Sequence, residues 1–355
     1  MPADPVTAQS ADPEPLPWAP GAATGVGSLP FDDPREAARL VLEELPDLPH
    51  VPELPGRGLG ADMVGRAVAL LADLHADHQP SGWRLVDRPG LDERRAGDFL
   101  ARDLDAVEEA ADGYVGPLKL QVIGPLTLVA GLELARGGAA LIDHGAVRDI
   151  AEALAEGVAA HVADLGRRVP GARLLLQVDE PSLPAVLAGR VPTVSGFGTV
   201  RAVPESVAIE RLGAVLAAGA AAGAMPLVHC CAADPPVTTA VRAGARAVSV
   251  DAAMLTGRAV IDAIGEAVEG GTSLLLGLVP ARGPGVAPSV REAAAPVRSL
   301  WHRLGFAPEL LGERVVVTPA CGLAGASVGW ALSAYRLCRQ VGRALHEAPE
   351  GDRVR

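Results

Sequence analysis

The sequence predicts a single (β/α)8 barrel of the TIM type, an α/β fold in which each parallel strand is followed by a helix. Short apolar runs rich in β-branched residues alternate with longer segments of helical period, a pattern typical of parallel strands joined by crossover helices. Eight such units within 355 residues fit a closed barrel. No G-x-G-x-x-G motif follows the first expected strand, which argues against a dinucleotide-binding sheet.

Each element of this barrel is predicted from its local pattern. The expected strands are short apolar runs at residues 24–29, 50–54, 118–123, 174–178, 225–230, 247–250, 274–279 and 315–318. The clearest helical patterns lie between them, at residues 34–45, 147–169, 205–222, 258–268 and 290–304. Residues 62–112 are mostly helical in pattern and longer than one crossover needs, so we expect a helical insertion there.

The domain organisation follows from composition. Hydrophobic residues make up 49% of the chain, which is enough for one large core spanning residues 21–346. Residues 1–20 are rich in Pro and acids and are expected to form a flexible leader, and residues 347–355 a tail. The leader lacks the basic start and apolar run of a secretory signal, and no long uncharged apolar stretch is present. We therefore expect a cytoplasmic protein without a membrane span.

Charge and cysteine content narrow the function classes. The formal net charge of −12 disfavours nucleic acids and anionic membranes as partners, because both require a basic surface. The basic residues are almost all arginine, with Lys119 as the single lysine, which we interpret as genomic base composition. Cysteines in a reducing compartment are usually free, metal-bound or catalytic. The chain has four of them, Cys230, Cys231, Cys321 and Cys338.

Polar residues gather at the carboxyl ends of the expected strands, the rim where barrels of this type carry their active sites. Seven strands end in this way, at Gly27-Ser28, Glu53, Gly124 to Thr127, Asp179-Glu180, His229 to Cys231, Asp251 and Cys321.

His229 and Cys231 form the sharpest motif on this rim. Residues two apart on a strand point to the same face, so both side chains converge while Cys230 points away. Asp251 and Cys321 follow the sixth and eighth strands, and one imidazole, one carboxylate and two thiolates are a suitable zinc set. Such a site could activate water for hydrolysis or a substrate thiol for alkyl transfer. Thiolate-rich ligation favours thiol activation, because it weakens zinc as a Lewis acid and leaves a bound sulfur more nucleophilic.

An ordered series of motifs between about residues 24 and 325 resembles the catalytic barrel of the cobalamin-independent methionine synthase family. The matching segments are Gly27-Ser28-Leu29-Pro30, Ala61-Asp62-Met63-Val64, Ile123-Gly124-Pro125-Leu126-Thr127, Gln177-Val178-Asp179-Glu180-Pro181, His229-Cys230-Cys231, Val248-Ser249-Val250-Asp251 and Pro319-Ala320-Cys321-Gly322-Leu323. His-x-Cys alone is common, whereas this order of segments is specific.

The resemblance implies a zinc-dependent methyltransferase that converts homocysteine to methionine. It places zinc on His229, Cys231 and Cys321, with Asp251 at the position of a fourth, carboxylate ligand. The amino-acid part of homocysteine would lie on the Gly27-Ser28 turn and on Asp179, which would pair with its ammonium. Glu53 and Glu180 are further candidates for substrate binding. The expected catalytic residues are Asp179, His229, Cys231 and Cys321.

Several departures from the family pattern leave the exact reaction open. Asp251 is shorter than the family's Glu ligand, Leu59 replaces a family Glu for which Glu53 could substitute, and Gly277 to Pro280 lacks the family's histidine. We also expect no counterpart of the N-terminal barrel of the long form, which helps to bind folate. The chain thus resembles the short, single-barrel relatives, and its methyl donor could be a methylfolate or a methylcorrinoid. The same residues would also suit alkyl transfer to another thiol, or a non-enzymatic barrel that binds zinc or a thiol.

Overall fold

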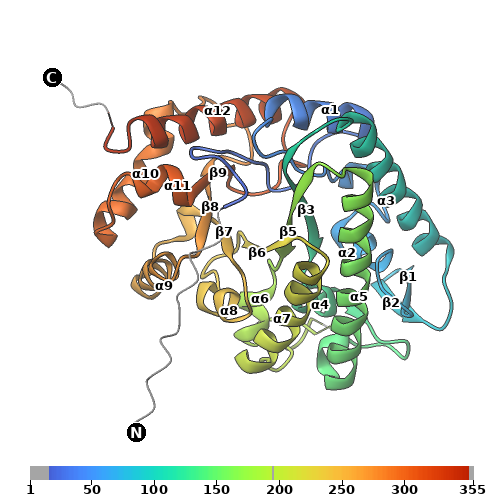
Figure 1. The fold of residues 1–355 in the computed structure, drawn as a ribbon. Helices are drawn as coiled ribbons and strands as arrows, with labels where there is room; N and C mark the ends of the chain where they lie inside the picture. Colours follow the sequence, from blue (N-terminus) through green and yellow to red (C-terminus); the bar gives the residue numbers. More distant parts are fainter. Residues whose placement is uncertain (1–15, 194–195, 352–355) are drawn as a thin grey trace, which may run out of the picture.

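A computed structural model describes residues 16–193 and 196–351 of the chain, and its centre is a curled parallel sheet (Figure 1). The sheet has six strands in the order β3-β5-β6-β7-β8-β9. These are β3 (Gly116–Ile123), β5 (Ala172–Asp179), β6 (Met225–Cys230), β7 (Ala247–Asp251), β8 (Ser273–Val279) and β9 (Val315–Pro319). The predicted parallel α/β fold of the TIM type and six of its strands are therefore confirmed.

The first two predicted strands do not form ladders, so six of the eight expected strands are shown and a full eight-stranded barrel is not. Residues 24–29 and 50–54 are joined to their neighbours only by single bridges, Ala23 to Val317, Ser28 to Glu53 and His50 to Lys119. These bridges place both segments between β9 and β3, at the two edges of the sheet. Gly25, Gly27 and the prolines at positions 30, 49, 52 and 55 explain why no ladder forms, because proline lacks an N–H donor and glycine weakens strands.

Helices cover the convex side of the sheet (Figure 1). The five predicted helices are present as α1 (Pro34–Glu44), α5 (His144–Arg168), α7 (Glu205–Ala221), α9 (Arg258–Glu269) and α10 (Val290–Leu304). Shorter helices α4 (Pro125–Gly131), α6 (Leu183–Leu187), α8 (Val237–Arg242) and α11 (Leu310–Arg314) and the long α12 (Val328–Glu347) complete this layer. No helix within the described residues is long and apolar enough to cross a lipid bilayer.

The insertion at residues 62–112 contains more than helices. It consists of α2 (Met63–Val68), the antiparallel hairpin of β1 (His75–Gln79) and β2 (Gly82–Val86), and α3 (Leu91–Ala110). The short strand β4 (Leu132–Glu133) adds to β2 in parallel. The helical prediction was therefore right for α2 and α3 and missed the hairpin, whose polar residues show no clear alternation of apolar side chains.

Inward-facing side chains of the sheet change character along the strands. Near the amino ends they are apolar and form one buried cluster: Leu175, Leu227, Ala247, Leu275 and Val316, together with Trp18, Ala22 and Leu48. Trp18 belongs to the segment predicted as a flexible leader, but it is only 6% exposed, and residues 1–15 lie outside the described part of the chain. Further along, the buried inward-facing residues become polar, at Gln121, Gln177, His229 and Ser249, and on β3 the polar residues begin with Lys119 at the level of Leu175.

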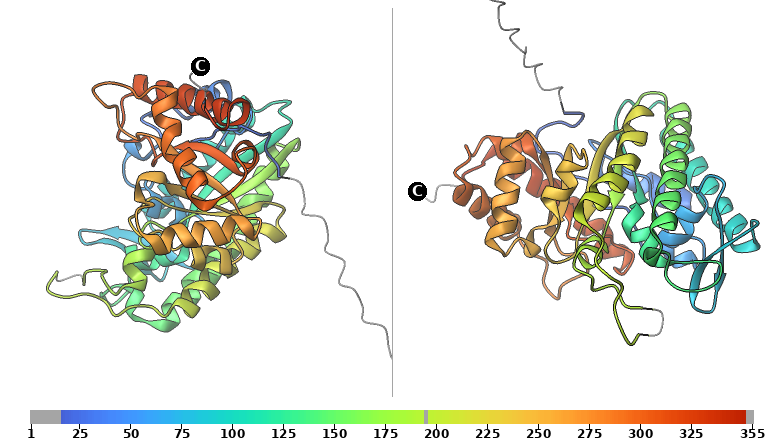
Figure 2. Two further views of the ribbon diagram at one scale, coloured as in Figure 1. Left: turned by 90° about the vertical axis from the view of Figure 1, so that its left-hand side faces the viewer. Right: turned by 90° about the horizontal axis from the view of Figure 1, so that it is seen from below.

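The carboxyl ends of the strands open on the opposite side from this cluster. The loop between α6 and α7 projects there, away from the side on which the N-terminal segment enters (Figure 2). The amino end of the sheet is thus filled by apolar side chains, and polar groups are concentrated toward the other end.

Candidate active site

Neighbouring strands bring the predicted rim residues to the same level. In the parallel ladders, Asp179 of β5 lies opposite His229 of β6, and Asp251 of β7 lies opposite Gly277 of β8. Cys231 follows β6 directly, and Cys321 follows β9 by two residues. Parallel strands end at one edge of a sheet, and these side chains consequently surround one small region.

Three of the four predicted metal ligands converge in this region. The potential ligand atoms of His229, Cys231 and Cys321 all lie within 4.8 Å of one another, and the two sulfurs are 3.1 Å apart. Zinc–sulfur bonds of about 2.3 Å in tetrahedral geometry separate two sulfurs by about 3.8 Å. A shift of a few tenths of an ångström on each side would therefore admit the ion. The donor set of one imidazole and two sulfurs fits zinc.

The ring of His229 is oriented for this role by β7. Its Nδ1 lies 2.9 Å from Oγ of Ser249, and the side chain is only 4% exposed. With Nδ1 occupied by this hydrogen bond, Nε2 is the nitrogen left to bind a metal.

The two thiols share their protons unequally. Hydrogen bonds from Cys231 and then from His229 lower the pKa of Cys321 to about 4, against the opposing effect of burial. The same Cys231–Cys321 contact raises the pKa of Cys231, and burial adds to this rise. The sulfur of Cys321 is thus readily a thiolate, and it accepts a hydrogen bond from the thiol of Cys231. Binding of a metal ion to both sulfurs would displace the proton of Cys231.

Asp251 lies near the three ligands without joining them. Its Oδ1 accepts a hydrogen bond of 2.9 Å from the backbone N–H of Ala253, where it caps the short helix that follows β7. Burial raises its pKa, and Cys321 and His229 both act on it electrostatically. The predicted fourth ligand is therefore close to the site, but the described group of potential ligands contains only His229, Cys231 and Cys321.

The Gly27-Ser28 turn lies against the loop that carries Cys321. The backbone N–H of Leu323 donates to the carbonyl of Ser28 at 2.8 Å. Gly322 approaches the turn closely, because a Cβ atom there would lie 2.1 Å from Oγ of Ser28. The predicted turn for the amino-acid part of a substrate and one predicted metal ligand are consequently neighbours.

Glu53 is attached to the same turn. Its backbone N–H donates to the carbonyl of Gly27 at 3.1 Å, and its own carbonyl accepts from Leu29 at 2.8 Å. Its carboxylate lies 3.4 Å from Nε of Arg66. Another guanidinium nitrogen of Arg66, Nη1, pairs with the buried Asp103 at 2.7 Å. The structure thus places Glu53, Gly27 and Ser28 together.

Asp179 stands beside His229. Its Oδ1 accepts a hydrogen bond of 2.7 Å from Nε2 of Gln177, and the residue is 5% exposed. Burial raises its pKa to about 7, and Glu53 adds to this rise whereas His229 opposes it. A cationic group entering the site would therefore meet a carboxylate that ionises near neutral pH.

Glu180 does not share this location. It is fully buried, and its carboxylate accepts hydrogen bonds from the backbone N–H groups of Leu126 and Thr127, both at 2.8 Å, and from the Thr127 hydroxyl at 2.6 Å. Successive residues of a strand point to opposite faces, so Glu180 points outward when Asp179 points inward. Its position does not support the predicted contact with substrate, and we assign it to anchoring α4.

Comparison with known proteins identifies the chain. Residues 104–344 match the family described as "Cobalamin-independent synthase, Catalytic domain". This match covers more than half of the sequence. The chain belongs to the cobalamin-independent methionine synthase family. No curated protein sequence matches it.

One solved structure agrees with this family at the level of the fold. A B12-independent methionine synthase from a Shewanella species, solved in complex with selenomethionine, is similar with a TM-score of 0.62 and 12% identity, over 93% of this chain and 98% of that chain. A D-psicose 3-epimerase from Clostridium cellulolyticum and a 2,3-dimethylmalate lyase each reach a TM-score of only 0.36. Their identities are 12% and 16%, and the matches cover 70% and 90% of this chain and 84% and 81% of theirs.

Some residues of this methionine synthase-like site were not predicted from the sequence. Ser249 and Gln177 contact His229 and Asp179, and both could have been found, because each lies two residues before a candidate on the same strand face. The contact of Lys119 with Val26 could not have been found in this way, because the two residues are 93 positions apart in the sequence.

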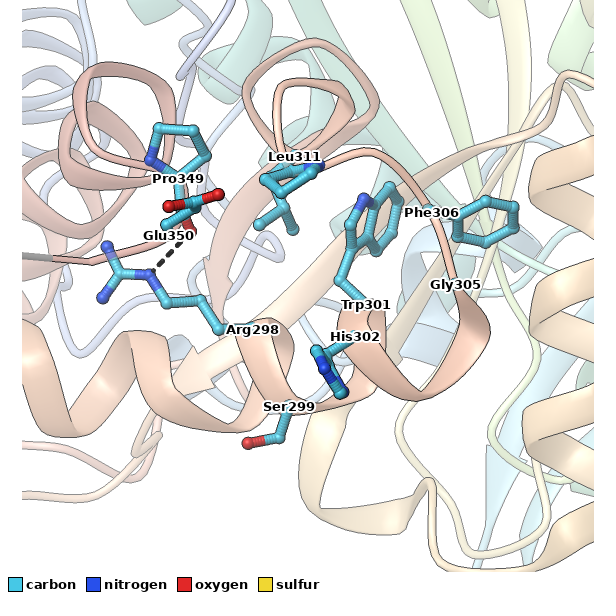
Figure 3. Close-up of a pocket in the computed structure, with 10 residues that line it drawn as sticks. Arg298, Ser299, Trp301, His302, Gly305, Phe306, Leu311, Pro349 and Glu350 are labelled. Atoms are coloured by element: carbon cyan, nitrogen blue, oxygen red, sulfur yellow. Dashed lines mark hydrogen bonds between the residues drawn. The ribbon is translucent and has the colours of Figure 1, made fainter. Parts of the chain in front are cut away.

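A cavity of about 770 Å³ lies elsewhere, between α10, α11 and the end of α12 (Figure 3). Trp301, Phe306 and Leu311 line it, and Arg298 at its edge donates to the carbonyl of Pro349 at 3.1 Å. It contains none of the candidate site residues, so we place the active site of this methionine synthase relative at the carboxyl ends of the strands.

Proposed function

We propose that this protein is a zinc-dependent S-methyltransferase that converts homocysteine to methionine. The observation that carries the proposal is the convergence of His229, Cys231 and Cys321 within 4.8 Å, beside Asp179 and the Gly27-Ser28 turn. The likeness of the fold to a methionine synthase that binds selenomethionine supports the choice of substrate class.

In this proposal one set of residues binds the metal ion and another set binds the amino-acid part of the substrate. Zinc held by His229, Cys231 and Cys321 would lower the pKa of a substrate thiol. Asp179 pairs with the substrate ammonium, Glu53 adds a second carboxylate, and the Gly27-Ser28 turn holds the rest of the amino acid. Together these residues fix the sulfur in line with the incoming methyl group. The substrate thiol gives its proton to water, a carbon–sulfur bond forms, and the donor leaves with the electron pair of its bond to methyl.

The methyl donor is the open part of the proposal. A folate leaves as an amine that must take up a proton, whereas a corrinoid leaves without one. The end of β8 and the first residue after it, Gly277-Leu278-Val279-Pro280, contain no histidine to supply that proton. This observation favours a methylcorrinoid, or another thiol with its own donor, as the second candidate function.

Metal analysis of purified variants tests the site directly. We expect about one zinc per wild-type chain and a large loss in Cys321→Ser, because removing a thiolate removes a ligand. Cys338→Ser is the matched control, since Cys338 is buried on α12 and is outside the group of potential ligands found among the described residues. Full zinc occupancy in Cys321→Ser would remove this residue from the site.

Activity with parallel donors tests the reaction. Zinc-loaded protein is supplied with homocysteine and either methylfolate or methylcobalamin, and methionine is measured. Turnover with methylfolate alone would exclude the corrinoid candidate. Tight homocysteine binding without transfer from any donor would instead indicate a non-enzymatic thiol-binding protein.

A further inference from the structure

Lys119 is an unusual residue for this chain. Of 31 basic residues other than histidine it is the single lysine, and its side chain is fully buried. An ammonium group in a protein interior is costly unless it is well paired. Genomic base composition explains the many arginines, but it does not explain why a lysine remains at this position.

The Lys119 ammonium connects segments that are distant in the sequence. Its Nζ donates to the carbonyl of Val26 and to Oε1 of Gln121, both at 2.9 Å. Val26 immediately precedes the Gly27-Ser28 turn. A compact ammonium on an unbranched stem can reach two such acceptors where a planar guanidinium would need more room.

Gln121 extends the connection to Glu53. Its Nε2 donates to the carbonyl of Val51 at 2.8 Å, two residues before Glu53. The fit is close on the other side as well, because a Cβ atom on Gly27 would lie 2.9 Å from the same nitrogen. Gln121 thus lies against both the segment that contains Gly27 and the segment that contains Val51.

Gln177 connects the same carbonyl to Asp179. Its Nε2 donates to Val26 at 2.9 Å and to Oδ1 of Asp179 at 2.7 Å. The segments that carry Ser28 and Glu53 have only single bridges to the sheet. These internal hydrogen bonds are therefore a large part of what fixes their position.

We propose that Lys119 is a positioning residue that, through Val26 and Gln121, holds the Gly27-Ser28 turn and Glu53 in the arrangement that binds the amino-acid part of a thiol substrate. The proposal rests on the proposed function for the nature of that substrate. We assign Lys119 no contact with the substrate, because its side chain is fully buried and its Nζ donates to Val26 and Gln121.

The charge of Lys119 provides a way to separate two roles. Burial lowers its pKa, and the carboxylates of Asp179 and Glu53 oppose this effect. If Lys119 acted only by its charge, its removal would strengthen the attraction of both carboxylates for a substrate ammonium. If it acts by positioning, its removal weakens binding of the amino acid.

The test compares two thiols by calorimetric titration of zinc-loaded protein. L-homocysteine carries both charged groups, and 1-propanethiol keeps the sulfur and alkyl chain without them. In Lys119→Met we expect the preference for homocysteine over propanethiol to fall by about tenfold or more, with zinc content unchanged. Thr24→Val is the matched control, because Thr24 lies in the same segment and its buried Oγ1 has no hydrogen-bond partner among the described residues.

A second variant covers a failure of Lys119→Met to fold. Gln121→Met keeps the lysine charge and removes the connection to Val51, so the same loss of preference is expected. An unchanged or increased preference in either folded variant would overturn the inference. A wild-type protein that binds both thiols equally would overturn the amino-acid site itself, and with it the proposed function.

Discussion

The Ser249 hydroxyl lies 2.9 Å from Nδ1 of His229 and comes from the adjacent strand. Groups of this kind orient metal-binding histidines and fix the tautomer, and they raise the affinity of the site for its metal. The inward face of β7 is thus part of the proposed zinc site, although it supplies no ligand to the described group.

We expect Ser249→Ala to weaken zinc binding by roughly 10- to 100-fold while leaving the fold intact. Competition with a chromophoric chelator would measure this affinity. Ser273→Ala is the matched control, because Ser273 is buried on β8 and its Oγ has no described hydrogen-bond partner. Equal zinc affinity in wild type and Ser249→Ala would mean that the ring of His229 is oriented by its packing alone.

The apolar cluster at the amino ends of the strands depends on a residue outside the regular elements. Trp18 packs with inward-facing residues of β5 to β9, and its indole N–H is buried without a described partner. Its contribution therefore comes from apolar contact and not from hydrogen bonding.

Two substitutions at Trp18 separate these contributions. Trp18→Ala should lower the free energy of unfolding by about 3 kcal/mol or more, since a large buried side chain leaves a cavity. Trp18→Phe should cost much less, because it retains most of the ring and removes an unpaired donor. Urea unfolding measures both values. Equal losses in the two variants would show that the indole nitrogen matters.

At the level of elements, the sequence predicted what local periodicity determines. The boundaries of β6 and of α10 agree fully with the predictions. The segments around Gly27 and Glu53 were expected to be strands, but they pair by single bridges because glycine and proline interrupt their ladders. The hairpin in the insertion was missed because β1 and β2 have no alternation of apolar and polar residues.

His161 makes the free energy of unfolding of the whole molecule depend on pH. Burial, followed by the charge of Arg66, lowers its pKa to about 4. As the pH falls, the unfolded chain takes up a proton near pH 6.5 while the folded protein does not. The stability associated with neutral His161 is therefore present above about pH 6.5 and is lost as the pH decreases toward 4.

We expect His161→Leu to reduce the loss of stability between pH 7 and pH 5 by about 2 kcal/mol relative to wild type. Burial raises the pKa values of Asp179 and Glu180 to about 7, so protonation of these two acids stabilises the folded protein as the pH falls. This gain partly masks the loss of stability caused by His161. The difference between the two unfolding profiles isolates His161. Parallel profiles would show that this ring is accessible to protons in the folded state.

The candidate site was predictable to the extent that its residues follow strand ends. His229 and Cys231 share a face because they are two residues apart, and their meeting with Cys321 follows from the curvature of the sheet. Glu180 was misplaced because the side-chain alternation after Asp179 was not applied to it. The roles proposed for Lys119 and Gln121 depend on hydrogen bonds to segments about 70 to 90 residues away, which no local pattern encodes.

Two kinds of backbone carry the two halves of the proposed site. His229 lies in a strand of the continuous ladder, and Cys231 and Cys321 follow such strands within two residues. Ser28 and Glu53 belong instead to segments that each have one bridge to the sheet and one bridge to each other. Regions with few backbone hydrogen bonds open at lower free energy than the rest of a protein. As the temperature rises, affinity for the substrate's amino and carboxyl groups would therefore decrease before affinity for a metal ion does.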